Sequence, residues 1–447
     1  MAIDSLDIVP FNNSSELYVN IPGSKSISNR ALILSVLNKN DVKINGLLKS
    51  DDVEIMITAL KKLGVIINEY DNIVEIKGTG GELVKKSASI NVGNAGTVAR
   101  FLTALLALQK EGQYHLDGSE AMRKRPMKGL IEALEIHGCK FDFQEKEYHF
   151  PFIINCNGLN SHDWVIDASM SSQILSAILM IAPYINGKKY IQLTGTTVSR
   201  PFVEMTIEMM SQFAPVESRN EIKQQRNKYL IGCFDYELND GTYFIEPDAT
   251  AASYYLSLPI ATKGVVRIDN LQKIVLQGDI NYCKILSICG LFINYTSDCI
   301  EASFKKPVVG GNYDFNDISD TFLTLAALSP LLNTPLKISG IGHTRNQETD
   351  RVSGMATELK KLLFSVEEQE DSLHLFPHEN LNKFLRGDKI SIETYDDHRF
   401  AMSFSILGSH DLFKNQKPWI QIIDPMCCTK TFPLFYQELD KCRSNAE

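Results

Sequence analysis

Several features are missing from the 447-residue sequence, and each missing feature excludes a class of protein. No uninterrupted apolar run approaches the roughly 20 residues that a membrane-spanning helix needs. No Lys or Arg precedes Lys25, and the first twenty residues hold no apolar core of signal-peptide length. The net charge of −9 argues against a general nucleic-acid surface. We therefore expect a soluble, cytoplasmic chain with neither membrane nor nucleic acid as a partner.

Cysteine and histidine patterns are equally uninformative about metals. The nine cysteines form no CxxC pair, and the nine histidines show no ligand spacing, so we expect reduced thiols, no disulfide framework and no metal. A Walker A loop is excluded as well, because the glycine and Gly-Lys pair that it requires are missing around Lys25. No cofactor is predicted.

What the sequence does contain is a long repeat. Six times, a short polar segment leads directly into an apolar helix-like run, at steps of about 75 residues. A period of this length exceeds that of the short solenoid repeats, so each unit is expected to be a small subdomain. The six runs start near Ser24, Gly93, Ser169, Asp248, Asn316 and Asp396.

Each repeat also contains a second predicted helix and short β-like stretches. Three of the second helices are followed by Gly64, Gly138 and Gly290, the residue type that commonly ends a helix. The unit therefore reads β-α-β-α-β-β, six times. The first helix of each unit is apolar nearly all round, which indicates burial on every side.

Polar residues gather where these helices begin, and helix N-termini attract anions because their N–H groups are unpaired. Any one Ser, Asp or Asn there is more simply an N-cap. Cations need another explanation, because the helix dipole disfavours them at this end. The string MRKRPM places three cations before Pro126, which we expect at the first helical position, and four more basic residues fall in first turns: Arg200, Arg351, Arg399 and Lys430.

Other strings add groups suited to binding and proton transfer. PGSKSISNRAL (22–32) puts two cations and two hydroxyls on one helix start, and GNAGT (93–97) brings backbone close to a ligand. ISD (318–320), QETDR (347–351) and TYDDHR (394–399) add carboxylates and a histidine. Acids beside Arg and His at several helix starts favour proton transfer in an anion pocket.

In this order the motifs resemble the EPSP synthase family, from about Leu17 to Phe435. The strings that carry the resemblance are PGSKSISNRAL, SDDV, GNAGT with Arg100, RKRP, SSQ, SRPF, ISD, ETDR, TYDDHR and DPMCCTKTF. The resemblance implies a two-domain inside-out α/β barrel, each domain built from three βαβαββ units with buried parallel helices. One domain would span 23–245 and the other 1–22 plus 246–447, with the active site in the cleft between them. A monomer is expected.

The resemblance also implies the reaction: transfer of the enolpyruvyl group of phosphoenolpyruvate to the 5-hydroxyl of shikimate 3-phosphate, without a cofactor. Asp320 resembles the proton acceptor and Glu348 the proton donor, with Lys25 able to share either duty. The implied shikimate 3-phosphate contacts are Lys25, Ser26, Arg30, Ser171, Ser172, Gln173, Ser199, Asp320 and Gln347. The implied phosphoenolpyruvate contacts are Lys25, Asn94, Gly96, Arg125, Gln173, Arg351, Arg399 and Lys430, and the same site would hold Asp52 and His398.

Three positions depart from the family's commonest pattern: Phe202 replaces Tyr, Gln347 replaces Lys, and His343 replaces Asn. They bear on shikimate 3-phosphate binding. Two alternatives stay open. A UDP-N-acetylglucosamine enolpyruvyl transferase would carry a loop cysteine, and the corresponding stretch, GSEAMRKRP (118–126), has none. A non-catalytic anion-binding relative would not need Asp320, Glu348 and His398.

Overall fold

The computed structural model describes residues 4–11, 16–160, 162–169, 171–195, 199–273, 275–363 and 365–444. Met170, in the third repeat, and residues 196–198, before SRPF, lie outside the described residues. The chain divides into two compact units, each described here by itself. Gly23–Ile245 forms the continuous unit, and Met1–Pro22 with Glu246–Glu447 forms the split unit.

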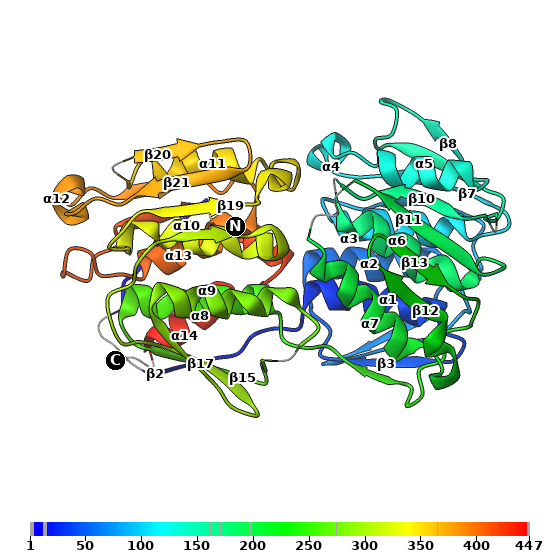
Figure 1. The fold of residues 1–447 in the computed structure, drawn as a ribbon, viewed down its shortest axis with the longest axis horizontal. Coiled ribbons are helices and arrows are strands. Elements are labelled where there is room, and N and C mark those ends of the chain that lie inside the picture. The colour runs from blue at the N-terminus through cyan, green and yellow to red at the C-terminus, as the bar shows by residue number, and fades with distance from the viewer. Residues whose placement is uncertain are drawn as a thin grey trace. The chain divides into compact units, whose positions relative to one another are not determined.

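Three four-stranded sheets build the continuous unit (Figure 1). In each sheet the first two strands are parallel and the last two pair antiparallel. In sheet order the strands are β14 (Thr242–Phe244), β3 (Val42–Asn45), β5 (Ile73–Ile76) and β4 (Ile67–Tyr70); β6 (Ser87–Asn91), β7 (Gly112–Asp117), β9 (Phe152–Cys156) and β8 (Lys140–Phe143); and β10 (Trp164–Asp167), β11 (Lys189–Thr194), β13 (Lys228–Ile231) and β12 (Ile222–Gln225).

The split unit repeats this pattern with one difference. Two of its sheets have four strands, and the described residues of the third give only three, so the sixth copy departs from the predicted βαβαββ order. In sheet order, with the parallel pair first, the strands are β2 (Glu16–Val19), β15 (Val265–Asp269), β17 (Cys299–Phe304) and β16 (Leu291–Tyr295); β18 (Asn312–Asp314), β19 (Leu336–Ser339), β21 (Ser372–Phe376) and β20 (Ser365–Glu368); and β22 (Ile390–Ile392), β23 (Ile420–Ile423) and β1 (Ser5–Ile8).

The chain's path explains why strands from distant segments share sheets. β14, at the end of the continuous unit, completes the sheet of the first repeat by pairing parallel to β3. β2, near the N-terminus, pairs parallel to β15, and β1 pairs antiparallel to β23. The N-terminal strands therefore belong with the C-terminal half of the sequence.

The first helices of the repeats are the buried ones, as their apolar composition predicts. They are α1 (Lys25–Leu37), α3 (Gly96–Ala107), α6 (Ser172–Ile181), α8 (Ala249–Thr262), α10 (Phe322–Leu328) and α13 (His398–Gly408). All residues of α3, α10 and α13 are buried. α1, α3 and α6 contact one another in the continuous unit, and α8, α10 and α13 do so in the split unit.

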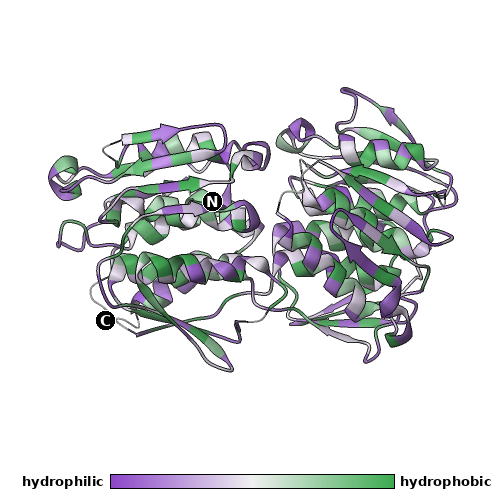
Figure 2. Cartoon of the chain, in the orientation of Figure 1, coloured by the Kyte–Doolittle hydropathy of each residue, from purple (hydrophilic) through white to green (hydrophobic). Residues whose placement is uncertain are grey.

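Each second helix packs one of its faces against this core and exposes the opposite face to solvent. Hydrophobic positions are concentrated inside each unit (Figure 2). The second helices are α2 (Asp51–Lys62), α5 (Lys128–Ile136), α7 (Pro201–Phe213), α9 (Tyr282–Cys289), α11 (Arg351–Leu359) and α14 (Phe435–Ser444), with short helices α4 (Glu120–Lys124) and α12 (Leu381–Leu385). Gly64, Gly138 and Gly290 all have positive φ, so the predicted helix ends are confirmed.

Short 3₁₀ segments join these elements: η1 (Ala182–Tyr184), η2 (Val216–Glu221), η3 (Gly278–Asn281), η4 (Asn316–Thr321), η5 (Ser329–Leu331), η6 (Gly342–Asn346) and η7 (Pro425–Lys430). Among the described residues, no helix is both long enough and apolar enough to cross a membrane. The layered mixed α/β fold agrees with the predicted fold class.

Candidate active site

The start of α1 places a lysine beside a carboxylate. Ser24 caps the helix by accepting the N–H of Ile27 at 3.5 Å, so the expectation that this serine is an N-cap is confirmed. Lys25 follows at the first helical position, and its Nζ lies 3.2 Å from Oδ2 of Asp52 at the start of α2. Both side chains are largely buried, so this ion pair joins the two helix starts that carry the PGSKSISNRAL and SDDV motifs.

Arg30 lies one turn further along α1 and is fully buried. Its guanidinium donates to the Thr206 hydroxyl at 2.7 Å, to the Ser26 carbonyl at 2.9 Å and to the Phe202 carbonyl at 3.2 Å. Burial lowers the pKa of Arg30 to about 9. These neutral acceptors hold a cation below the helix start, where it increases the positive potential.

Phe202, one of the three departures from the family pattern, packs its ring near Arg30. The Arg30 guanidinium lies 6.0 Å from the Phe202 ring centroid and 5.2 Å from that of Phe101. Two apolar rings therefore face the buried cation, and the Phe202 ring has no hydroxyl to offer a ligand.

The start of α3 brings several donors around one glycine. A methyl group at Gly96 would lie 2.7 Å from Nη2 of Arg125, 3.0 Å from Nη1 of Arg100 and 3.0 Å from Oε1 of Gln173. Arg125 is 8% exposed and donates to the Asn94 carbonyl at 3.4 Å. A methyl group at this position would therefore push on the ends of these three side chains, which glycine allows to lie close to the start of α3.

Polar atoms in this cluster lack partners within the described residues. They are Oδ1 of Asn94, Nε of Arg125 and Oε1 of Gln173, all of them buried. Buried polar atoms are normally hydrogen-bonded, and exceptions call for a ligand or water. Donors and acceptors around Gly96 are therefore arranged for a small polar molecule.

The third helix start contributes hydroxyls. Ser171 caps α6 by accepting the N–H of Gln173 at 3.2 Å, and Ser172 is buried beside it. Ser199 is buried with φ of 49°, a left-handed conformation that non-glycine residues seldom adopt. This serine is held in an unusual backbone conformation directly before α7.

The MRKRPM string folds differently from the prediction. Pro126 is not at the first position of a helix, because α5 starts at Lys128 and Met127 is its N-cap. Arg123 and Lys124 instead end α4, where the dipole favours cations, and Arg123 pairs with Asp117 and Glu145 at 2.7 Å. Of these three cations, only Arg125 contacts the Gly96 cluster. The prediction that a cation at a helix start marks an anion site is therefore wrong for Arg123 and Lys124, which lie at a helix end.

Two more cations lie elsewhere than predicted. Arg200 is the N-cap residue of α7, but its side chain is half exposed and pairs with Glu204 at 3.2 Å. Lys430 ends the 3₁₀ turn η7, five residues before α14, so it is not in the first turn of that helix. Arg351 and Arg399 do occupy first turns, those of α11 and α13.

The split unit builds a dense ion cluster around Arg351, whose side chain is 1% exposed. Its Nε lies 2.7 Å from Oδ2 of Asp397, its Nη1 3.0 Å from Oδ1 of Asp320, and its Nη2 2.7 Å from Oε2 of Glu348. Nη1 also donates to Oε1 of Gln347. Burial alone would disfavour the cation, but Asp397 and Glu348 outweigh it and raise the pKa of Arg351 above its usual value.

Arg399 and Lys430 complete this cluster. Nη2 of Arg399 lies 2.7 Å from Oδ2 of Asp320, and its Nη1 lies 3.4 Å from the Tyr254 hydroxyl. Nζ of Lys430 lies 3.4 Å from Oε1 of Glu348. Three cations thus meet three carboxylates, so their formal charges cancel.

Two further positions join the cluster. The His398 ring nitrogen Nδ1 lies 3.8 Å from Oδ1 of Asp397, which also accepts the backbone N–H of Arg399 at 3.0 Å. His343 bonds the Ser319 hydroxyl at 2.9 Å, one residue from Asp320, and burial lowers the pKa of His343. The departure at His343 therefore supports the loop that carries Asp320.

Sequence reasoning passed over Asp397 and Asp279. Asp397 is 0% exposed and anchors both arginines, although TYDDHR offered two aspartates and the second is the N-cap of α13. Asp279 lies in η3, which packs against η4 and α8, and its Oδ2 accepts the Thr250 hydroxyl. Burial and the nearby Asp320 carboxylate raise the pKa of Asp279 to about 7.

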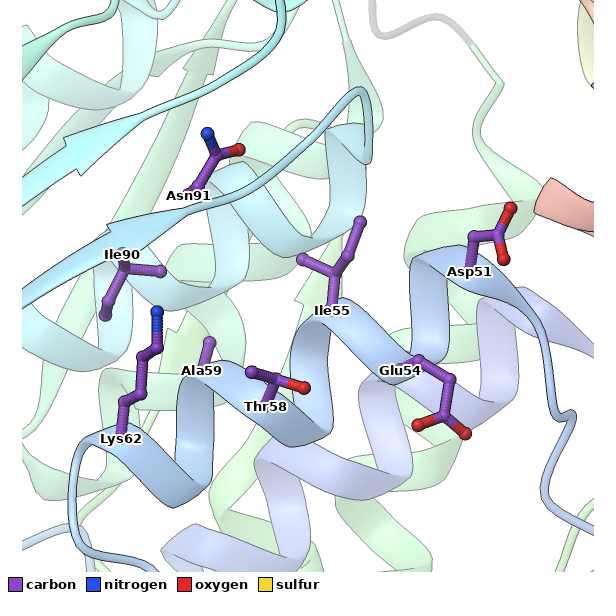
Figure 3. Close-up of a pocket in the computed structure, with 8 residues that line it drawn as sticks. All are labelled: Asp51, Glu54, Ile55, Thr58, Ala59, Lys62, Ile90 and Asn91. Carbon is purple, nitrogen blue, oxygen red and sulfur yellow. The ribbon is translucent and has the colours of Figure 1, made fainter.

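A pocket of about 280 Å³ along α2 and β6 has a different character (Figure 3). Asp51 and Glu54 line it together with Lys62 and Asn91, so acids outnumber the single lysine. Burial and the Glu69 carboxylate raise the pKa of Glu54. An anionic substrate is not suited to this pocket, which shares no lining residue with the cluster around Gly96.

Six helix-bearing repeats with clustered cations and carboxylates define an α/β enzyme that handles small anions. The sequence profile of EPSP synthase (3-phosphoshikimate 1-carboxyvinyltransferase) matches residues 13–439. The chain belongs to this family, and the predicted family and enzyme class are confirmed.

Individual relatives agree with this assignment. The chain is 41% identical to the 3-phosphoshikimate 1-carboxyvinyltransferase of Opitutus terrae, over 99% of this chain and 98% of that protein. It is 36% identical to the enzyme of the same name from Nostoc punctiforme, over 97% and 98%. Its fold is similar to the solved EPSP synthase of Acinetobacter baumannii, with a TM-score of 0.77 at 22% identity, and 98% of each chain is covered.

Proposed function

We propose that this enzyme transfers the enolpyruvyl group of phosphoenolpyruvate to the 5-hydroxyl of shikimate 3-phosphate, releasing phosphate, in the shikimate pathway to chorismate. The observation that carries the proposal is the buried cluster of Arg351, Arg399 and Lys430 with Asp320 and Glu348. Cations alone would serve anion binding, but carboxylates held among them at 2.7–3.4 Å add groups that can move protons.

Shikimate 3-phosphate is assigned to hydroxyls, amides and cations at the helix starts. Ser171, Ser172 and Ser199 are small polar groups at or beside such starts, where N–H groups favour phosphate. Arg30, in the second turn of α1, adds positive potential near the start of that helix. The proposed contacts are Lys25, Ser26, Arg30, Ser171, Ser172, Gln173, Ser199, Asp320 and Gln347.

Phosphoenolpyruvate is assigned to the Gly96 cluster and to the cations of the split unit. The unpartnered atoms of Asn94, Arg125 and Gln173 support the first part of this assignment. The buried Arg399 supports the second, since its Nε has no partner among the described residues. The proposed contacts are Lys25, Asn94, Gly96, Arg125, Gln173, Arg351, Arg399 and Lys430.

Ion pairing suggests how Glu348 becomes an acid. Arg351 and Lys430 pair with its ionised carboxylate at 2.7 and 3.4 Å. When the phosphate and carboxylate of phosphoenolpyruvate take over these cations, Glu348 loses that stabilisation and its affinity for a proton rises. The substrate thereby prepares the acid that will protonate it.

The reaction then proceeds by addition and elimination. Glu348 protonates the methylene carbon, positive charge develops at C2, and the 5-hydroxyl attacks C2 while Asp320 accepts the hydroxyl proton. The resulting ketal expels phosphate after a carboxylate removes a proton from the new methyl group, which regenerates the double bond. Arg351, Arg399 and Lys430 stabilise the anionic groups throughout.

The alternatives are less well supported. A UDP-N-acetylglucosamine enolpyruvyl transferase would require a cysteine in the segment 118–126, and this segment has none. Its central residues form the short helix α4. In a non-catalytic relative, Asp320 and Glu348 would serve only as counter-ions to the buried cations, and the Glu348→Gln variant separates that role from proton transfer. We further propose a cytoplasmic monomer, for which nine free thiols suit a reducing compartment.

Phosphate release in the presence of both substrates tests the proposal. We expect release only when shikimate 3-phosphate and phosphoenolpyruvate are both present, with enolpyruvylshikimate 3-phosphate as product by mass spectrometry. UDP-N-acetylglucosamine in place of shikimate 3-phosphate should give none. A folded protein that releases phosphate only with UDP-N-acetylglucosamine, or with neither acceptor, overturns it.

A further inference from the structure

The turn before α13 has a backbone conformation that its side chains do not favour. Tyr395 and Asp396 have φ values of 57° and 55°, and the N–H of Asp397 donates to the Thr394 carbonyl at 2.9 Å. Positive φ at both central residues is the pattern of a type I′ turn, which prefers Gly, Asn or Asp. Asp396 fits this preference, but a bulky tyrosine does not, so other contacts must hold Tyr395 in place.

A buried carboxylate on α11 supplies those contacts. Glu358 is 1% exposed, and its Oε1 accepts the Tyr395 hydroxyl at 2.8 Å. Its Oε2 accepts the backbone N–H of Glu393 at 3.1 Å and Nζ of Lys361 at 2.6 Å. The Glu358 carboxylate therefore binds the chain at Glu393, just before the turn, and at Tyr395, within it.

The same face of α11 touches this segment at two more places. Arg351, Gly354 and Glu358 are spaced i, i+3, i+7 and so lie on one side of the helix. A methyl group at Gly354 would lie 2.7 Å from Cζ of Phe400 and 3.4 Å from Cε2 of Tyr395, so the glycine permits close approach. The Tyr395 and Phe400 rings meet edge to face, with centroids 5.3 Å apart.

We propose that Glu358 and Tyr395 are positioning residues that hold the strained 394–397 turn. The turn directly precedes α13, so its geometry fixes Asp397 beneath Arg351 and places Arg399 against Asp320. This inference rests on the proposed role of Arg399 and Arg351 in binding phosphoenolpyruvate. Losing the support should let the turn relax and displace these groups, which weakens phosphoenolpyruvate binding more than shikimate 3-phosphate binding.

Tyr395→Phe is the mildest test, because it removes only the hydroxyl. We expect KM for phosphoenolpyruvate to rise about 3- to 10-fold, a fraction of the roughly 10- to 150-fold that a hydrogen bond to a charged group is worth, because the loss reaches the site only through the turn. KM for shikimate 3-phosphate should change by less than twofold. Tyr18→Phe is the matched control, since the Tyr18 hydroxyl also donates to a carboxylate, Glu16 Oε1 at 3.0 Å, on β2.

Replacing Tyr395 with Ala and with Gly separates the backbone from the side chain. Both variants lose the ring and hydroxyl, but Gly accepts positive φ and Ala does not. A turn under strain predicts that KM for phosphoenolpyruvate is at least threefold higher for Tyr395→Ala than for Tyr395→Gly. Melting temperatures of all variants show whether the fold itself is affected.

Three outcomes would overturn the proposal: a normal KM for Tyr395→Phe, equal values for the Ala and Gly variants, or equal losses for both substrates alongside a lower melting temperature. Arg399→Ala, measured in parallel, keeps the two hypotheses apart. If Arg399→Ala binds phosphoenolpyruvate normally, the proposed function of Arg399 is wrong. If Arg399→Ala is impaired but Tyr395→Phe is normal, only the positioning role is wrong.

Discussion

Replacing Glu348 with Gln removes a transferable proton while it keeps the size and hydrogen-bonding capacity of the side chain. If Glu348 protonates the methylene carbon, kcat should fall by roughly 100-fold or more, the usual weight of a general acid. That loss corresponds to about 2.7 kcal/mol in the activation barrier. A side chain that only capped a helix or paired with cations would give a much smaller change in turnover.

The ion cluster also sets the expected effect on binding. Glu348 Oε1 lies 3.4 Å from Lys430 Nζ, and unit charges at this separation attract by about 5 kcal/mol at an effective dielectric of 20. Phosphoenolpyruvate must replace this attraction to occupy Lys430 and Arg351. Neutral Gln competes less, so the Kd for phosphoenolpyruvate should stay unchanged or tighten by up to about tenfold.

Steady-state phosphate release and calorimetric titration of each substrate check both halves of this prediction. Glu301→Gln is a suitable control, because Glu301 pairs with Arg267 at 2.9 Å on β17 of the same unit. Turnover of Glu348→Gln within threefold of the unmodified enzyme would remove Glu348 from proton transfer and shift the role to Lys25 or Asp320. Weaker phosphoenolpyruvate binding would refute the competition argument.

Three further predictions follow from the site. Arg399→Ala should weaken phosphoenolpyruvate binding about 10- to 100-fold by calorimetry, since it removes a charge-assisted contact, and leave shikimate 3-phosphate nearly unaffected. Gly96→Ala should raise KM for phosphoenolpyruvate in steady-state assays, because the methyl group meets Arg125 at 2.7 Å. We also predict that glyphosate, which carries a phosphonate and a carboxylate, inhibits competitively against phosphoenolpyruvate and that Gly96→Ala relieves this inhibition. The pKa of Asp279 rises on folding from 3.8 to about 7, so its burial costs stability increasingly between those pH values. Urea denaturation should therefore show Asp279→Asn gaining stability over the original protein as pH rises from 4 to 7, and a constant difference would contradict this.

Repeat architecture was predictable because it depends on composition over long windows. Apolar runs that are uniform around the helix must be buried, and α3, α10 and α13 are buried along their whole length. Sheet membership was harder to predict, because it depends on pairing between distant segments. Nothing local in Ser5–Ile8 indicates that it pairs with Ile420–Ile423.

Residue types at the site were predictable, but their charge partners were not. The sequence predicts that the arginines in ETDR and TYDDHR bind anions, because helix dipoles disfavour cations in first turns. The structure gives a more local reason for their positions: Asp397 accepts both the Arg351 guanidinium and the Arg399 N–H. An N-cap aspartate and an ion-pairing aspartate look identical in sequence, so tertiary contacts decide which role it has.

In the ion cluster around Arg351, charge balance links the fold to the proposed catalysis. A buried arginine without a carboxylate would be costly, and the cluster supplies its own counter-ions in Asp320, Glu348 and Asp397. Two of the three are also the groups proposed to move protons. If substrate anions bind these cations as we propose, they must compete for them with the same carboxylates. Asp397 has the lowest exposure of the three and also caps α13, so it is the counter-ion that stays when the others are displaced.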